Sequence, residues 1–264
     1  MNKLFLILAF LFVCPAFAEA QDHDHDHDHG LHFSHPLIVE SPSPDKKVRI
    51  DYFYLRGEED GERFTEQTPR LEAEYAFRRF FSIEVNVPYT VHRAEGMPGQ
   101  SHADNVEVSL KFASFKFDEK GLLPTYGVSF DLPAGNGTGI GSDHIVTVEP
   151  FAGLGYKRRN LELIGITSFG FPTNTRAGDD EGKEFAFGFA SLYKVTPHIQ
   201  PLLEWDGHHI LSGPSRGETV VNVSPGIKLL PDEHHWQIGL GAGFPLTHAK
   251  EFKLRAIFSV FYHF

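Results

Sequence analysis

Residues 252–264, with the sequence FKLRAIFSVFYHF, place an apolar side chain at every second position. The residues on this face are Phe252, Leu254, Ala256, Phe258, Val260, Tyr262 and Phe264. The opposite face begins with Lys253 and Arg255 and also carries Ser259 and His263. Strict alternation over this length predicts a β-strand that separates an apolar environment from a polar one.

The same period of two recurs from Val48 to the end of the sequence. Residues 81–91 (FSIEVNVPYTV), for example, carry an apolar or aromatic side chain at each odd position. About twelve such segments follow one another, and no run with a helical period competes with them. Their expected spans are 48–56, 69–77, 80–92, 104–117, 123–134, 144–157, 160–172, 184–195, 198–210, 218–230, 235–246 and 251–264. The sequence therefore predicts an all-β chain.

The connections between these segments alternate in length. The short connections are residues 78–79, 118–121, 158–159, 196–197 and 231–235. The long polar connections are residues 57–67, 93–103, 134–143, 172–183 and 211–217. Short turns on one rim and long loops on the other are typical of outer-membrane barrels. We therefore expect a transmembrane antiparallel up-and-down β-barrel of about 12 strands over residues 48–264.

A secreted β-sandwich or a lipocalin-like barrel is the soluble alternative, and its apolar face would point inward. The aromatic residues at the expected strand ends and the density of charge on the polar face favour the membrane barrel. In that barrel the charged face lines the lumen. The expected lumen residues are Arg49, Asp51, Glu72, Glu74, Glu84, Glu107, Lys111, Asp131, Glu149, Glu204, Asp206, Lys253 and Arg255.

The final strand also carries a second signal. Its last alternating residues, Phe258, Val260, Tyr262 and Phe264, resemble the C-terminal recognition signal of bacterial outer-membrane proteins. The resemblance implies that the barrel-assembly machinery handles the chain and that the mature protein contacts outer-membrane lipid.

The N-terminal residues 1–20 (MNKLFLILAFLFVCPAFAEA) predict a secretory signal peptide, with cleavage after Ala18 or Ala20. The only cysteine, Cys14, lies within this segment, so we expect no disulfide in the mature protein. The formal net charge of −11 excludes a general binder of nucleic acid, because nucleic-acid phosphates require lysine and arginine.

Residues 21–47 combine the repeat QDHDHDHDHG (21–30) with the proline-rich spacer SPSPDKK (41–47). This composition predicts a disordered periplasmic tail. Imidazole nitrogens suit Zn²⁺, Cu²⁺ and Ni²⁺, so the tail is a candidate site for divalent metal, although the barrel requires no cofactor. The candidate ligands are His23, His25, His27, His29, His32, His35, Asp24, Asp26 and Asp28. The alternative is a pH-sensitive or merely solubilising spacer.

Three short motifs resemble the outer-membrane transporters grouped with the phenol meta-pathway protein. They are IEVNVPY (83–89), VSFDLPAGNGTGIGSD (128–143) and VEPFAGLGY (148–156). The resemblance implies a barrel and passage of small molecules, and it does not establish an aromatic substrate.

Together these patterns predict a narrow channel or transporter for a small solute or ion, with metal capture by the tail at the periplasmic mouth. Whether the charged lumen is open or plugged is left undecided by the sequence. One alternative is a lipid-modifying hydrolase of the outer membrane with His208 as base and Ser212 as nucleophile. Because the surrounding motif differs from that of such enzymes, we expect no enzymatic activity. A second alternative is a non-conducting structural barrel.

Overall fold

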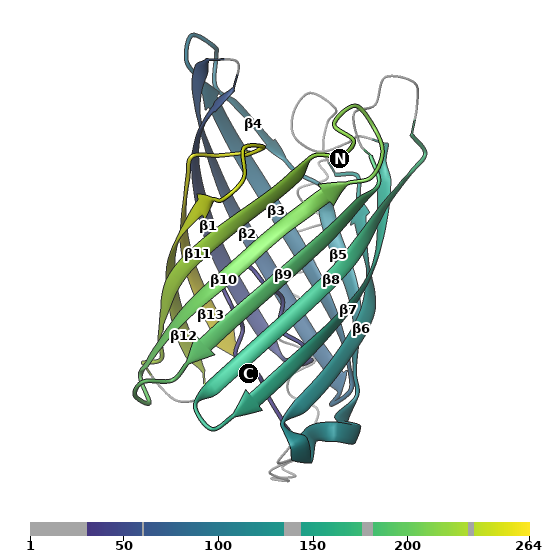
Figure 1. Cartoon of the computed structure of the whole chain (residues 1–264), viewed down its shortest axis with the longest axis vertical. Coiled ribbons are helices and arrows are strands. Elements are labelled where there is room, and N and C mark those ends of the chain that lie inside the picture. The colour runs from purple at the N-terminus through teal and green to yellow at the C-terminus, as the bar shows by residue number, and fades with distance from the viewer. Residues whose placement is uncertain (1–30, 60, 135–143, 176–181, 232–234) are drawn as a thin grey trace, which may run out of the picture. The chain divides into compact units, whose positions relative to one another are not determined.

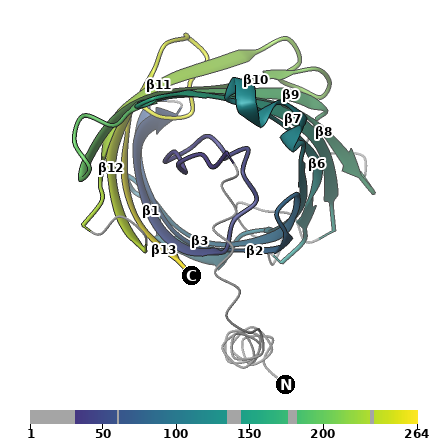
Figure 2. The same cartoon turned by 90° about the horizontal axis from the view of Figure 1, so that it is seen from below.

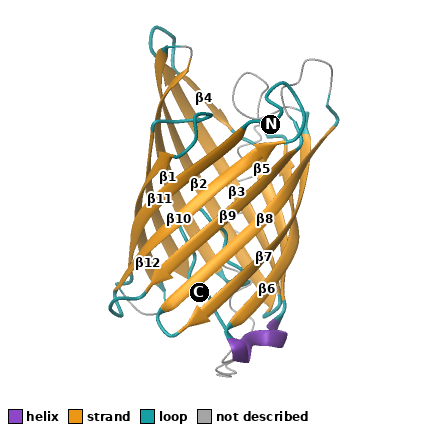
Figure 3. Cartoon of the chain, viewed as in Figure 1, coloured by secondary structure: helices purple, strands orange, loops and turns teal. Residues whose placement is uncertain are grey.

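The computed structural model describes residues 31–59, 61–134, 144–175, 182–231 and 235–264. These residues form thirteen β-strands and one short 3-10 helix, η2 (Phe115–Lys120), which connects β5 to β6 (Figures 1 and 3). The strands are β1 (Lys47–Glu59), β2 (Glu62–Arg78), β3 (Phe81–Ala94), β4 (Gln100–Ala103), β5 (Val106–Ala113), β6 (Leu122–Leu132), β7 (Val146–Arg158), β8 (Leu161–Thr173), β9 (Glu184–Tyr193), β10 (Ile199–Ile210), β11 (Thr219–Leu229), β12 (Trp236–Pro245) and β13 (Leu254–His263). In the described part of the chain, no helix is long and apolar enough to cross a membrane.

Twelve strands close into an antiparallel barrel, because β1 pairs with β2 along one edge and with β13 along the other (Figure 2). Tyr52 of β1, for instance, lies opposite Pro69 of β2 and Phe258 of β13. The short β4 pairs with β3 beyond the point where β3 leaves β5. Closure satisfies the backbone groups of every edge strand, as a β-structure in hydrocarbon requires. The predicted all-β, transmembrane antiparallel barrel is therefore confirmed.

Side chains on the barrel wall have the polarity expected for lipid outside and a polar interior. In β13, Phe258 and Tyr262 are exposed, whereas Ser259 between them is fully buried. The charged side chains of Asp51 and Glu204 are also fully buried. A soluble β-sandwich would show the reverse distribution, so this alternative is wrong.

Several boundaries differ from the predicted ones. The expected loop 57–67 continues the β1–β2 hairpin instead, because Gly57 pairs with Phe64 and Leu55 with Glu66. Phe252, expected on the outer face of the last strand, precedes β13 and is buried. Its ring packs against the Arg255 guanidinium, 4.9 Å away. Strand ends thus follow cross-strand pairing, which a single segment does not reveal.

The predicted tail is the main correction. Residues 31–46, here called the lumen segment, do not hang free but run through the inside of the barrel (Figure 2). Phe33, Leu37 and Val39 are 0 %, 1 % and 4 % exposed. So few apolar residues cannot form a core alone, which is why the segment reads as disordered, but the barrel interior supplies the missing partners. Residues 21–30 of the predicted tail lie outside the described residues.

Candidate functional site

A carboxylate on β10 binds three consecutive backbone groups of the lumen segment. Glu204 accepts hydrogen bonds from the N–H groups of Leu37, Ile38 and Val39, at 3.1, 2.9 and 2.9 Å. Arg49 of β1 donates a hydrogen bond to the Leu37 carbonyl. The lumen segment forms neither a helix nor a strand, so its backbone groups lack the partners that regular secondary structure supplies. The side chains of Glu204 and Arg49 bond to groups that would otherwise be unpaired.

Three further barrel side chains hold the start of the segment. Lys228 of β11 donates to the His35 carbonyl at 2.6 Å, and Lys157 of β7 donates to the His32 carbonyl at 2.7 Å. Glu162 of β8 accepts the N–H of Ser34 at 2.8 Å. Strands from distant parts of the chain therefore converge on one short peptide and hold the lumen segment inside the barrel.

Three glycines on the inner wall make room for Leu37. A methyl group added at Gly239, Gly241 or Gly226 would lie 2.2, 2.9 and 3.0 Å from Leu37 methyl carbons. Carbon atoms do not approach so closely without displacement, so only glycine allows this fit. The Gly-rich pattern of β12 is thus explained by the side chain that it receives.

Buried ion pairs join the lumen segment to the wall at a second level. The Lys47 ammonium lies 2.6 Å from Glu72 and 3.1 Å from Glu74, and the Lys111 ammonium lies 2.6 Å from Glu40 of the segment. Burial alone would raise the pKa of Glu40, but Lys111 and Lys47 hold the pKa well below its ordinary value. The Glu40 carboxylate therefore remains ionised and bound.

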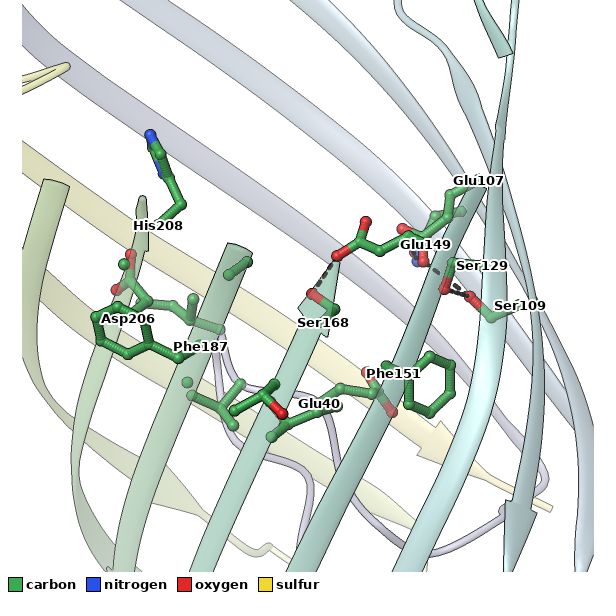
Figure 4. Close-up of a pocket in the computed structure, with 18 of the residues that line it drawn as sticks. Glu40, Glu107, Ser109, Ser129, Glu149, Phe151, Ser168, Phe187, Asp206 and His208 are labelled. Atoms are coloured by element: carbon green, nitrogen blue, oxygen red, sulfur yellow. Dashed lines mark hydrogen bonds between the residues drawn. The ribbon is translucent and has the colours of Figure 1, made fainter. Parts of the chain in front are cut away.

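A cavity of about 340 Å³ lies beside the lumen segment within the barrel (Figure 4). Its acidic lining residues are Glu40, Glu72, Glu84, Glu107, Glu149, Glu184, Asp206 and Glu251. Its basic ones are Arg70 and Lys111. Phe151 and Phe187 add two aromatic faces to the same wall (Figure 4). Carboxylates thus outnumber cationic side chains around this space.

Neutral hydrogen bonds hold two of these carboxylates in place. Ser109 donates to Glu107 at 2.8 Å and is itself 2.7 Å from Ser129, while Ser168 donates to Glu149 (Figure 4). These bonds orient the two groups without neutralising their charge. Both carboxyl groups are therefore fixed in place at the wall of the cavity.

The structure places the expected lumen residues as follows. Those buried inside the barrel are Arg49, Asp51, Glu72, Glu74, Glu84, Lys111 and Glu204. Those partly buried on the strands are Glu107, Asp131, Glu149, Asp206 and Arg255. Lys253 is placed differently, because it precedes β13, is half-exposed and pairs with Glu58 near the end of β1. Sequence reasoning missed Glu162 and Lys228, although both alternate with apolar neighbours on predicted strands.

The hydrolase alternative does not find its pair of residues in contact. His208 lies 3.7 Å from Glu251, and the Ser212 hydroxyl accepts the N–H of Lys183 at 2.8 Å. Among the described residues, neither side chain hydrogen-bonds to the other. A nucleophilic serine needs a base within hydrogen-bond reach, so this geometry does not support the proposed chemistry.

Two of the nine expected metal ligands, His32 and His35, are described, and both meet Asp45 at the end of the lumen segment. His263 of β13 also meets Asp45, at 2.8 Å. Burial alone would raise the pKa of Asp45, but hydrogen bonds from His263, His32 and His35 hold the pKa well below its ordinary value. Burial, assisted by the Lys47 ammonium, lowers the pKa of His35, so its ring is neutral. Asp45 and His263 carry no distinguishing signal in the sequence.

The remaining expected ligands, His23, His25, His27, His29, Asp24, Asp26 and Asp28, lie outside the described residues. Three residues of the expected assembly signal, Phe258, Val260 and Tyr262, lie in β13, and the fourth, Phe264, follows it directly. Their role in assembly stays a prediction.

Neither a family model nor a curated protein sequence matches this chain. Several solved structures share its fold. The COG4313 outer-membrane channel from Pseudomonas putida F1 matches with a TM-score of 0.68 and 11 % identity, over 92 % of this chain and 100 % of that one. The NanC porin matches with a TM-score of 0.58 and 8 % identity, over 82 % of this chain and 98 % of that one. The KdgM porin matches with a TM-score of 0.53 and 15 % identity, over 82 % of this chain and 99 % of that one.

At these identities the likeness shows a common barrel fold. The fold is that of outer-membrane channels and porins, and these matches span nearly the whole length of the similar chains. The resemblance to the phenol meta-pathway transporters is not confirmed by a family match and stays a prediction.

Proposed function

We propose that this protein is an outer-membrane channel for small cationic solutes, closed by its own lumen segment. The observation that carries the proposal is the excess of carboxylates around the lumen cavity, eight acidic side chains against two basic ones. Glu40, Glu72, Glu84 and Asp206 form ion pairs with Lys111, Lys47 and Arg255, so Glu107, Glu149, Glu184 and Glu251 account for the excess. Rings of acidic side chains select cations in other pores, because their negative charge attracts cations and repels anions. The channel-type fold supports the same reading.

The position of the charges supports selectivity rather than simple solubility. Glu107 of β5 and Glu149 of β7 lie on different parts of the wall around one cavity, whereas Asp206 of β10 is paired with Arg255 of β13 at 2.5 Å (Figure 4). In a partly desolvated lumen, charges interact several times more strongly than in bulk water. An anion entering this space would therefore meet repulsion that a cation does not.

The lumen segment gives the channel its closed state in this proposal. It lies inside the ring of strands and lines one side of the cavity through Ile38, Val39 and Glu40 (Figure 2). Passage of a solute then requires the segment to move aside. We place the N-terminal side of the barrel in the periplasm, where short turns connect the strands.

Ion selectivity tests the proposal directly. In a planar bilayer under a salt gradient, the full-length protein should give a reversal potential of the sign expected for cations. Replacing Glu107 and Glu149 by glutamine should move that potential toward zero, because two fixed negative charges disappear. The matched change Glu218→Gln, just outside β11 and away from the cavity lining, should leave it in place. An anion-selective current from the unaltered protein would contradict the proposal.

Metal capture is a second candidate function. Residues 22–29 alternate aspartate and histidine, and the two histidines that follow converge on one carboxylate. We propose that this N-terminal region concentrates Zn²⁺, Cu²⁺ or Ni²⁺ at the channel mouth. Calorimetric titration of Zn²⁺ into the full-length protein and into a variant lacking residues 21–35 tests this function. Equal heats from both proteins would exclude it.

A further inference from the structure

Two imidazole rings and one carboxylate meet where the lumen segment begins and ends. His32 Nε2 lies 3.2 Å and His35 Nε2 lies 2.9 Å from Asp45 Oδ2. The donor atoms of these three residues all lie within 4.8 Å of one another. We infer that His32, His35 and Asp45 form a defined site for a single divalent transition-metal ion, with Zn²⁺ as its representative. The inference deepens the proposed metal capture and does not depend on the channel activity.

The two separations from the Asp45 oxygen fit such an ion closely. Zn²⁺ binds histidine nitrogen and carboxylate oxygen at roughly 2.0–2.2 Å, which places neighbouring tetrahedral ligand atoms about 3.3 Å apart. The separations around Asp45 are only a few tenths of an ångström shorter. Two histidines and one carboxylate are also a donor set that zinc sites use, with the fourth position open to water.

His263 supports the site from the barrel wall. Its Nδ1 lies 2.8 Å from the same oxygen of Asp45, and its ring centre lies 5.6 Å from that of His35. Its Nε2 is buried and has no hydrogen-bond partner among the described residues. A carboxylate that binds a metal is commonly fixed by a hydrogen bond of this kind. We therefore assign His263 as a positioning residue that orients Asp45.

The Nδ1 atom of His35 can carry the proton that metal binding displaces from Nε2. At present its Nδ1 accepts a hydrogen bond from the Lys47 ammonium at 2.9 Å. When Nε2 binds a metal, a neutral imidazole must carry its proton on Nδ1. Carboxylate oxygens of Glu40 and Glu74 lie within 4.8 Å of a His35 ring nitrogen, so a small movement of the side chains would let one of them accept a hydrogen bond from this N–H. Lys47 retains Glu72 at 2.6 Å, so the exchange leaves neither group unpaired.

The location gives the ion both access and a structural effect. The His32 side chain is 54 % exposed, so an ion can enter from that side, whereas His35 is buried. The ligands come from the two ends of the lumen segment, thirteen and ten residues apart. A bound ion would therefore close the segment into a loop and fasten it beside β1. The aspartate–histidine repeat precedes the site directly in the sequence and can supply it with metal.

Binding of Zn²⁺ to full-length variants tests this site, with a chromophoric chelator as competitor and the absorption spectrum of bound Co²⁺ as a second readout. The parent for the test carries serine in place of His23, His25, His27 and His29, so that the repeat no longer binds. We expect this parent to bind one equivalent of Zn²⁺ and to show the intense visible absorption of tetrahedral Co²⁺. His32→Ala and Asp45→Asn should abolish both signals.

Two controls make the outcome specific. His198→Ala removes an exposed histidine in the β9–β10 turn and should leave binding unchanged. His263→Gln should weaken Zn²⁺ binding about 10–100-fold without removing it, as the loss of an outer hydrogen bond does. If the parent binds no Zn²⁺, or if His32→Ala and Asp45→Asn bind it as the parent does, the site is wrong. Metal binding that requires the repeat alone would leave the metal-capture proposal standing without this site.

Discussion

At the scale of single residues, the lumen is organised by side chains that bind backbone. Glu204 receives three consecutive N–H groups of the lumen segment, and such charge-assisted bonds are stronger than neutral ones. The sequence predicted a charged residue in the lumen at this position but could not predict its partner. The partner lies 165–167 positions away, and a local period carries no information across that separation.

Glu204→Ala should therefore favour the open channel. Hydrogen bonds to a charged group contribute about 1.5–3 kcal/mol each, so a net loss of even one shifts the closed-to-open ratio about tenfold or more. Single-channel recordings in planar bilayers measure this as an increase in open time. Glu149→Gln is the matched control, since Glu149 lines the same cavity and its hydrogen bond is to Ser168 of β8. Unchanged open time in Glu204→Ala would show that the segment is not the closing element.

Gly239→Ala should act through packing instead of charge. The added methyl group would lie 2.2 Å from a Leu37 methyl carbon, so the Leu37 side chain has to move away from β12. Overpacking of this kind costs about 1–3 kcal/mol, which falls on the seated form of the segment. Limited proteolysis should then cut the lumen segment faster than in the unaltered protein. Gly165→Ala, where an added methyl group has no neighbour within 4 Å, should not change the cleavage rate.

At the scale of elements, strands and plug differ in how far the sequence predicts them. Each strand records its two environments in its own alternation, so the twelve spans could be predicted with errors mainly at their ends. The short β4 was missed because it pairs with β3 inside an expected loop. The lumen segment was missed because it carries only a short apolar run around Leu37 and Val39, with Phe33 apart from it, and these residues depend on strands from β1 to β13. The candidate site shares that dependence, which is why Asp45 and His263 were not predicted.

A disulfide between the segment and the wall should lock the plug. A Cβ atom at Gly188 of β9 would lie 3.0 and 3.3 Å from the two Cγ atoms of Val39, where a cysteine sulfur would stand. This proximity suits a disulfide. The only native cysteine, Cys14, lies in the predicted signal peptide and should not compete. Val39→Cys with Gly188→Cys should form the bond on oxidation, measured by loss of free thiols, whereas Val39→Cys alone should keep its thiol.

At the scale of the whole molecule, the fold separates a lipid-facing apolar surface from an acidic interior. The barrel and its polarity follow from a period of two repeated along the chain, and the structure confirms both. The balance of charge inside the barrel can be recognised only once the strands are closed, because Glu107, Glu149 and Asp206 come from three separate segments of the sequence. Closure also seats a plug of the chain's own residues beside that acidic cavity (Figure 2). The gated, cation-selective channel that we propose would join these two features.

The most direct test of this account is the current through the Val39→Cys, Gly188→Cys protein in a planar bilayer under a potassium chloride gradient, before and after reduction. We predict almost no current while the disulfide holds the lumen segment. Reduction should restore current, and its reversal potential should have the sign for cations. Equal currents in the oxidised and reduced states, with the disulfide verified, would contradict the plug, and an anionic reversal potential would contradict the proposed selectivity.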